Sequence, residues 1–404
     1  MPMLAFLPWL RLDQPVRVGS FHAFPQGIGG TLPDGVASSV ALDSIHKVLG
    51  QHHADANRPL AVLSVLQYDG RPVGDDFNED ERAAIFRFGQ HLSVAGLSER
   101  LFTGSFPDTY TASGHYQVIV QSFAEPYKGG ANLTFRRKGG HANVMMGQTN
   151  LRFVMPAHLV TQGEPTLNLP LLSALQALPT LPPAIQEHVG ASVSQFLLAN
   201  GDSPDVPPDV EATASYSALE RLIDDHGIGK VRPGLLALLS AADGTPCAQL
   251  LRDKLPPFEA DRPTFAKWVG QLYNLRGRLA HGKSAAGYKS DWLQFEHLVA
   301  AAFAYPLALK GLLAKHGLYE LTDDDVARVL GLEGLLGARP FFDRVDAAGA
   351  AAADLDEASA LAMRVSRWQA QFEIIKQAMA VVGIRKVLQQ SLDLHERRSP
   401  PVTH

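Results

Sequence analysis

The sequence predicts an α+β fold, in which a β-rich N-terminal domain at residues 1–165 precedes a helical C-terminal part. Short segments rich in β-branched and aromatic residues, separated by Gly, Pro, Asp and Asn, fill the first 165 residues and are typical of strands. From residue 214 onward the apolar residues recur at helical spacing. The chain has 404 residues, 46% hydrophobic and 19% charged, so it is long enough for two or three domains with buried cores.

The N-terminal domain is expected to consist of short strands interrupted by one helix. That helix is predicted at residues 80–94, where four apolar side chains share one face. Lys138, Gly139 and Gly140 follow a β-rich run and predict a hairpin turn. The expected strands cover residues 16–24, 60–68, 116–123, 132–137 and 151–154.

Residues 166–212 are expected to connect this domain to a helical bundle. They contain a helical stretch with a proline break at 179–183, and then a linker at 200–210 with three prolines and three aspartates. The bundle is predicted at 213–316 and a helical extension at 317–404, where an alanine-rich linker at 347–356 precedes a long helix at 357–394. One face of that last helix is apolar, so it could support dimerisation or pack on its own domain. The bundle helices are expected at 216–225, 233–240, 264–280 and 291–315.

Charge and cysteine content exclude several classes of protein. The net charge of −5 argues against a chain built wholly around nucleic acid. Residues 214–316 nevertheless carry 13 basic and 9 acidic residues, which favours a phosphate-binding module, although so small a surplus also arises by chance. The single cysteine, Cys247, excludes an internal disulfide framework and any site that needs several cysteine ligands.

The sequence predicts a cytoplasmic protein without membrane association. The first ten residues are apolar but lack a basic leading region and contain Pro2 and Pro8, which argues against a signal peptide. The longest apolar stretch, residues 298–309, is shorter than the roughly 20 residues that a membrane-spanning helix needs.

The most informative segment is residues 264–283, TFAKWVGQLYNLRGRLAHGK. On a helical projection Arg276 lies in the middle of an apolar stripe, where it must bind an anion or a carboxylate, because an unpaired charge is costly to bury. His281 follows about 140° further round a regular helix, with Gly282 as the expected C-terminal cap, and Arg278 faces solvent. The stripe itself consists of Phe265, Trp268, Val269, Leu272, Leu275 and Leu279.

This pattern of Tyr273, Arg276, His281 and Gly282 resembles the HEPN superfamily (higher eukaryote and prokaryote nucleotide-binding domains). Ribonuclease members of that superfamily carry an Arg-x4-to-6-His motif on a helix. The resemblance covers about residues 213–316. It implies a homodimer in which two motifs face each other across the interface.

Three further features bear on the resemblance. Residues 217–222 resemble the first helix of such domains, in which an acidic residue, here Glu220, accompanies the motif arginine. The segment 196–203, followed by Glu211, is similar to uncharacterised bacterial proteins with a C-terminal domain of this kind, and these are the only proteins that the region before the bundle resembles. Ribonuclease members frequently have Asn, Asp or His directly after the motif arginine, whereas this chain has Gly277.

The chemistry implied by the motif needs no metal and no cofactor. The ribose 2′-hydroxyl of RNA is itself a nucleophile, His281 can move its proton, and Arg276 can bind the phosphate in the transition state. The hypothesis is therefore an endoribonuclease that acts on RNA, including tRNA, and leaves a 2′,3′-cyclic phosphate, as a toxin or antiviral effector would. Supporting residues are Glu220, Tyr273, Asn274 and Arg278, and candidate RNA-binding residues are Lys283 and Lys289.

Several alternatives stay open. Arg276 could simply pair with Glu220 to hold two helices in register, and His281 could interact only with the helix dipole. The helical domain would then be a non-catalytic scaffold for nucleotide binding, RNA binding or dimerisation. His52, His53 and Asp55 lack the spacing of a metal site and are expected in a solvated loop.

Overall fold

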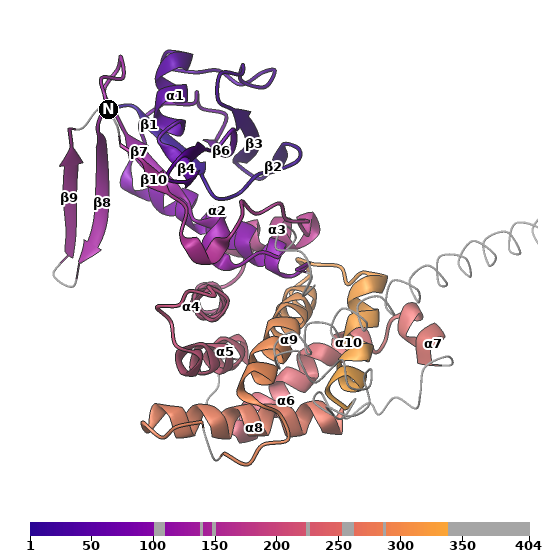
Figure 1. The fold of residues 1–404 in the computed structure, drawn as a ribbon. Coiled ribbons are helices and arrows are strands. Elements are labelled where there is room, and N and C mark those ends of the chain that lie inside the picture. The colour runs from indigo at the N-terminus through magenta and orange to yellow at the C-terminus, as the bar shows by residue number, and fades with distance from the viewer. Residues whose placement is uncertain are drawn as a thin grey trace, which may run out of the picture.

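The computed structural model describes residues 1–100, 110–137, 140–147, 151–223, 227–252, 262–285 and 288–337. A β-rich domain lies above a group of helices, and the two are joined through α2, Glu79–Leu97, and α3, Leu169–Gln176 (Figure 1). This arrangement confirms the predicted α+β fold. The alanine-rich linker and the long helix expected at 347–394 lie outside the described residues.

The core of the N-terminal domain is a seven-stranded antiparallel sheet with the order β2-β3-β6-β1-β7-β8-β9. Central strand β1 alternates between two hydrophobic clusters: Leu4 and Phe6 pack with α1, whereas Ala5 and Leu7 pack with α2. Helices therefore cover both faces of the sheet near β1. The strands are β1 Met3–Leu7, β2 Val16–Val18, β3 Phe21–Gly27, β6 Val62–Tyr68, β7 Ile119–Ser122, β8 Ala131–Arg137 and β9 Gly140–Met146.

Most predicted elements of this domain are present. The expected helix is α2, Glu79–Leu97, whose first turn is fixed by a capping box between Asn78 and Glu81. The segment predicted as one strand at 16–24 is instead the two strands β2 and β3, and the β8–β9 pair places Arg137 opposite Gly140, as the hairpin requires. Helix α1, Leu42–Leu49, and strand β1 were not predicted.

The prediction of a solvated loop at His52 is wrong. His52 is fully buried in β4, His52–Asp55, which forms a small second sheet with β5, Arg58–Pro59, and β10, Phe153–Val154. Its ring lies 4.9 Å from that of Phe6 and 5.1 Å from that of Phe153. Burial lowers the pKa of His52 to about 4, because the charged form loses its hydration. The residue is a core histidine.

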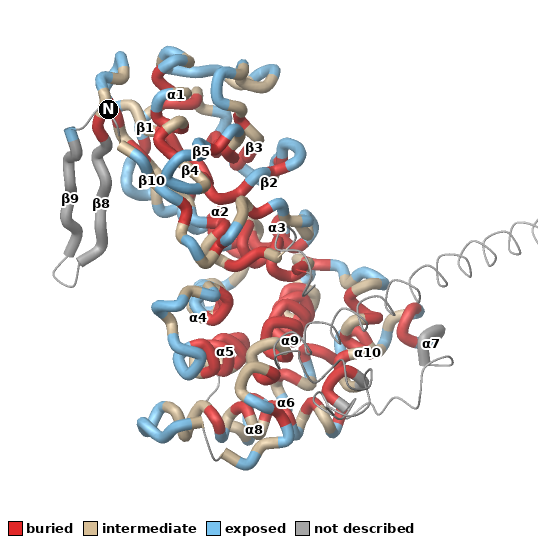
Figure 2. The backbone as a smooth tube through the Cα atoms, viewed as in Figure 1, coloured by how far each residue is buried: buried red, intermediate tan, exposed pale blue. Residues whose placement is uncertain are grey.

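The helical part is built around α9, which is buried along most of its length (Figure 2). By length and composition this helix could cross a membrane. The apolar stretch at 298–309 that was considered from the sequence is by itself too short to do so. Within the fold most of its apolar residues are buried, as in the core helix of a soluble protein. The helices are α3 Leu169–Gln176, α4 Pro183–Ala199, α5 Pro208–Ile223, α6 Ile228–Leu239, α7 Pro246–Arg252, α8 Pro263–Ala280, α9 Gln294–Lys315 and α10 Asp323–Gly337. Short 3₁₀ helices lie at Ser113–Tyr116, Ala157–Leu159, Leu178–Thr180 and Ser240–Ala242.

The linker predicted at 200–210 is shorter in the structure, because α5 begins at Pro208, and it is held against the N-terminal domain. Arg100 donates to the Asn200 side chain over 2.5 Å, and the Tyr110 hydroxyl donates to Asp202 over 2.6 Å. Glu211, in the first turn of α5, is buried close to Asp202. Burial, reinforced by the charge of Asp202, raises the pKa of Glu211 to about 7.

A Glu211→Gln substitution is therefore expected to stabilise the protein at pH 8. The folded chain holds the Glu211 proton to about pH 7, whereas the unfolded chain releases it near its ordinary pKa of 4.5. Wild-type stability consequently falls as the pH rises through that range. Urea unfolding should show the variant more stable by about 1–3 kcal/mol at pH 8, with the gap much smaller at pH 5. Asp205→Asn, an exposed carboxylate of the same linker, is the control, and an equal gap at both pH values would contradict the prediction.

Candidate functional site

Helix α8 carries the candidate motif and runs along the lower edge of the molecule (Figure 1). It begins at Pro263, which suits the first helical position because it has no N–H to leave unpaired. It ends at Ala280, after which Gly282 adopts a φ of +69°, which favours glycine. The predicted apolar stripe is buried as far as Leu275, whereas Leu279 is half-buried.

Arg276 was expected to be buried in the middle of the apolar stripe, but in the structure it is only half-buried and faces α5. Its side chain is 34% exposed, and its Nη2 lies 3.8 Å from Oε2 of Glu220, too far for a hydrogen bond. Its Nε is buried, and none of its N–H groups donates a hydrogen bond to a described residue. Glu220 therefore orients the guanidinium electrostatically and leaves its two Nη groups without a hydrogen bond to a described residue. The ion-pair interpretation and the functional one both account for this geometry.

Tyr216 lies beside the guanidinium of Arg276, and Tyr273 packs next to Tyr216. The guanidinium carbon lies 5.9 Å from the centre of the Tyr216 ring, at cation–π distance. The Tyr216 and Tyr273 rings are 5.5 Å apart. Tyr216 is fully buried, and its hydroxyl has no hydrogen-bond partner among the described residues. Burial and the nearby Glu220 raise the pKa of Tyr216 above its usual range, so the hydroxyl stays protonated.

His281 caps the C-terminal end of α8 and its side chain is exposed. Its backbone N–H donates to the Gly277 carbonyl over 3.2 Å, while its ring makes no hydrogen bond or ion pair with a described residue. Within one chain the structure does not bring His281 and Arg276 together. Five helical residues separate the two by about 140° around the axis and about 7.5 Å along it.

The segment after His281 folds back along α8. The Tyr288 hydroxyl donates to the Gln271 carbonyl over 2.9 Å, and Asp291 forms an ion pair with Lys267 at 2.6 Å. Arg278 donates to the Ser284 carbonyl over 2.6 Å, so this half-buried side chain braces the segment and does not simply face solvent as predicted. The remaining site residues Asn274, Lys283 and Lys289 are exposed.

Gly277 is not required by packing against the described residues. A Cβ atom built there would meet none of their atoms within 4 Å outside its own helical turn, and Gly277 lies inside α8 without a positive φ. The lack of a polar residue after Arg276 is thus a feature of the sequence that the fold does not impose. Among the described residues, no three His, Cys, Asp or Glu side chains are grouped as a metal site would need.

Two residues that sequence reasoning missed help to position the site. Tyr216 lies one helical turn before Glu220, so the spacing alone could have placed both beside Arg276. Glu333 of α10 accepts hydrogen bonds from the backbone N–H groups of Thr264 and Phe265, over 2.6 and 2.9 Å, and so caps α8. No local signal could have revealed that contact.

Comparisons of the chain with family models, curated proteins and solved structures found no match.

Proposed function

We propose that the protein is a metal-independent endoribonuclease of the HEPN type, which acts on RNA as a homodimer. One observation carries the proposal: the Arg276 guanidinium is fixed by Tyr216 and Glu220, is partly exposed, and has no hydrogen bond to a described residue. A planar guanidinium with two Nη groups available is suited to a phosphodiester, which it can bind through two oxygens at once.

The reaction needs only the RNA and two side chains. The ribose 2′-oxygen attacks phosphorus while a base removes its proton, the bond from phosphorus to the 5′-oxygen breaks, and that oxygen receives a proton. An exposed histidine such as His281 can carry out either proton transfer. Arg276 stabilises the charge that builds on the non-bridging oxygens. The products are a 2′,3′-cyclic phosphate and a free 5′-hydroxyl.

A two-fold dimer explains the separation of Arg276 and His281 within one chain. If α8 packs against its symmetry mate, Arg276 of one copy can converge with His281 of the partner subunit on one phosphate. The exposed Lys283 and Lys289 lie in the segment beyond α8 and can bind flanking RNA phosphates. We propose tRNA as one substrate, and a cytoplasmic toxin or antiviral effector as the physiological role.

A second candidate function is a non-catalytic scaffold that binds RNA or dimerises. Gly277 favours it, because the ribonuclease pattern has a polar residue at that position. The proximity of Glu220 to Arg276 also favours it, because an ion pair can serve helix packing alone.

RNA cleavage in EDTA tests the proposal. Purified full-length protein is expected to cut total RNA and tRNA and to leave cyclic phosphate ends, and His281→Ala should abolish the cleavage. His316→Ala is a matched control, because His316 also caps a helix C-terminus and also precedes a glycine with positive φ. Both variants lose the same interaction with a helix dipole, so their rates of RNA cleavage should differ only if His281 is catalytic. Equal inertness of wild type and both variants would favour the scaffold.

A further inference from the structure

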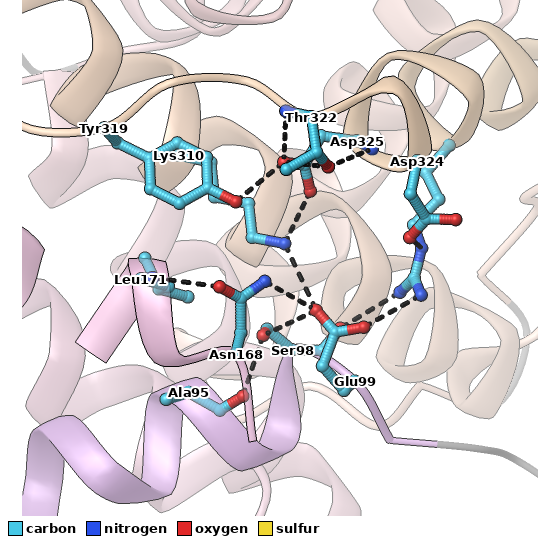
Figure 3. Close-up of polar contacts among 11 residues, drawn as sticks. Ala95, Ser98, Glu99, Asn168, Leu171, Lys310, Tyr319, Thr322, Asp324 and Asp325 are labelled. Atoms are coloured by element: carbon cyan, nitrogen blue, oxygen red, sulfur yellow. Dashed lines mark hydrogen bonds and ion pairs between the residues drawn. The ribbon is translucent and has the colours of Figure 1, made fainter. Parts of the chain in front are cut away.

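Charged side chains of α10 contact two distant parts of the chain. The first contact joins it to the end of α2 in the N-terminal domain (Figure 3). Arg328 donates to the Glu99 carboxylate over 3.0 Å and to the Ser98 carbonyl over 3.1 Å. It also pairs with Asp324 at 2.8 Å, so its guanidinium is held in one orientation.

A buried lysine completes this cluster. Lys310 of α9 is 1% exposed and lies between Asp325, at 2.6 Å, and Glu99, at 3.4 Å. Asn168 also donates to Glu99 over 2.8 Å. Because buried charges without partners are costly, the contacts around Glu99 form or break together.

The second contact joins α10 to α8. Glu333 lies five residues after Arg328 and binds the Thr264 and Phe265 N–H groups in the first turn of α8. A carboxylate at that end is favoured because the N–H groups there are unpaired and the helix dipole is positive. Between the two contacts Val329, Leu330 and Leu332 are buried, so the intervening turn is fixed by packing.

We propose that α10 couples the N-terminal domain to α8. Movement of the end of α2 away from Arg328 displaces α10, weakens the Glu333 cap, and loosens the helix that carries Arg276 and His281. The chain then has a physical path from its β-rich domain to the candidate site through two discrete charge contacts. The coupling itself does not depend on the proposed function, although its effect on RNA cleavage does.

Hydrogen exchange of the full-length protein tests the coupling. Glu99→Gln is expected to raise exchange in the first turn of α8 by about tenfold, as Glu333→Gln should. The double variant should add little to either, because both substitutions break one path. Glu81→Gln is the matched control, since Glu81 lies at the opposite end of α2 and pairs with Arg71. It should leave α8 unchanged.

Amides of α4 serve as the internal reference for global destabilisation. Faster exchange confined to α2, or a uniform increase that includes α4, would overturn the proposal. If Glu99→Gln does not fold, Arg328→Lys keeps the charge but lacks the planar set of donors that reaches Ser98, Glu99 and Asp324 at once, and the same pattern is expected. Cleavage is measured in parallel: exchange coupling without any RNA cleavage overturns only the proposed function, and cleavage without exchange coupling overturns only the role of α10.

Discussion

An Arg276→Lys substitution is expected to lower the rate of RNA cleavage by about 100-fold or more while leaving the unfolding temperature nearly unchanged. Lysine keeps the positive charge, and with it most of the attraction to Glu220. It lacks the planar set of donors that can bind two phosphate oxygens and stack on the Tyr216 ring.

This substitution separates the functional role of Arg276 from the structural one. Arg276 lies 3.8 Å from Glu220, so it forms no hydrogen bond that lysine would lose. If Arg276 only holds the two helices together, the substitution by lysine should have little effect. Arg232→Lys, at an exposed position of α6, provides the control and should cleave at the wild-type rate. Cleavage kinetics in EDTA and thermal unfolding are the two measurements. Full activity of Arg276→Lys would argue against a phosphate contact.

Asp325→Ala is expected to destabilise the protein by about 3–5 kcal/mol. Asp325 is 1% exposed and accepts hydrogen bonds from Lys310, at 2.6 Å, and from the Tyr319 hydroxyl, at 2.7 Å. It also accepts bonds from the backbone and the side chain of Thr322, over 3.0 and 2.9 Å. Its removal leaves the Lys310 ammonium buried beside Glu99 alone, at 3.4 Å.

Urea unfolding measures this effect, with Asp43→Ala as the control. Asp43 also forms a lysine ion pair at 2.6 Å, but its side chain is 74% exposed, so its loss should cost less than about 1 kcal/mol. Burial alone would raise the pKa of Asp325, yet Lys310 and the hydrogen bonds hold it below its usual value. Its contribution to stability is therefore lost as the pH falls through the acidic range. A loss of under 1 kcal/mol for Asp325→Ala at neutral pH would contradict the prediction.

How far the sequence predicted the structure depends on whether the signal was local. Helix α8 and its stripe were predicted because apolar residues repeat at helical spacing with a glycine after the last turn. Strand β1 was missed because it is buried against helices on both faces and so lacks alternating polar residues. His52 was wrongly predicted in a solvated loop for a related reason. Its polar neighbours along the chain gave no indication that it is buried in the core.

The candidate site shows the same division. The proximity of Glu220 to Arg276 was anticipated from their motif positions, and Tyr216 could have been, since it shares a helix face with Glu220. The contact of Glu333 with the start of α8 could not have been predicted, because it joins residues 68 and 69 positions apart through tertiary packing alone. The pairing of Arg276 with His281 across two copies remains a prediction.

The Glu333 cap also has a consequence during protein synthesis. Since chains are made from the N-terminus, α8 leaves the ribosome before the carboxylate that secures its first turn has been translated. The motif helix cannot reach its final packing until most of the polypeptide is complete. Under the proposed function, the cell would be protected from RNA cleavage by chains that are only partly synthesised.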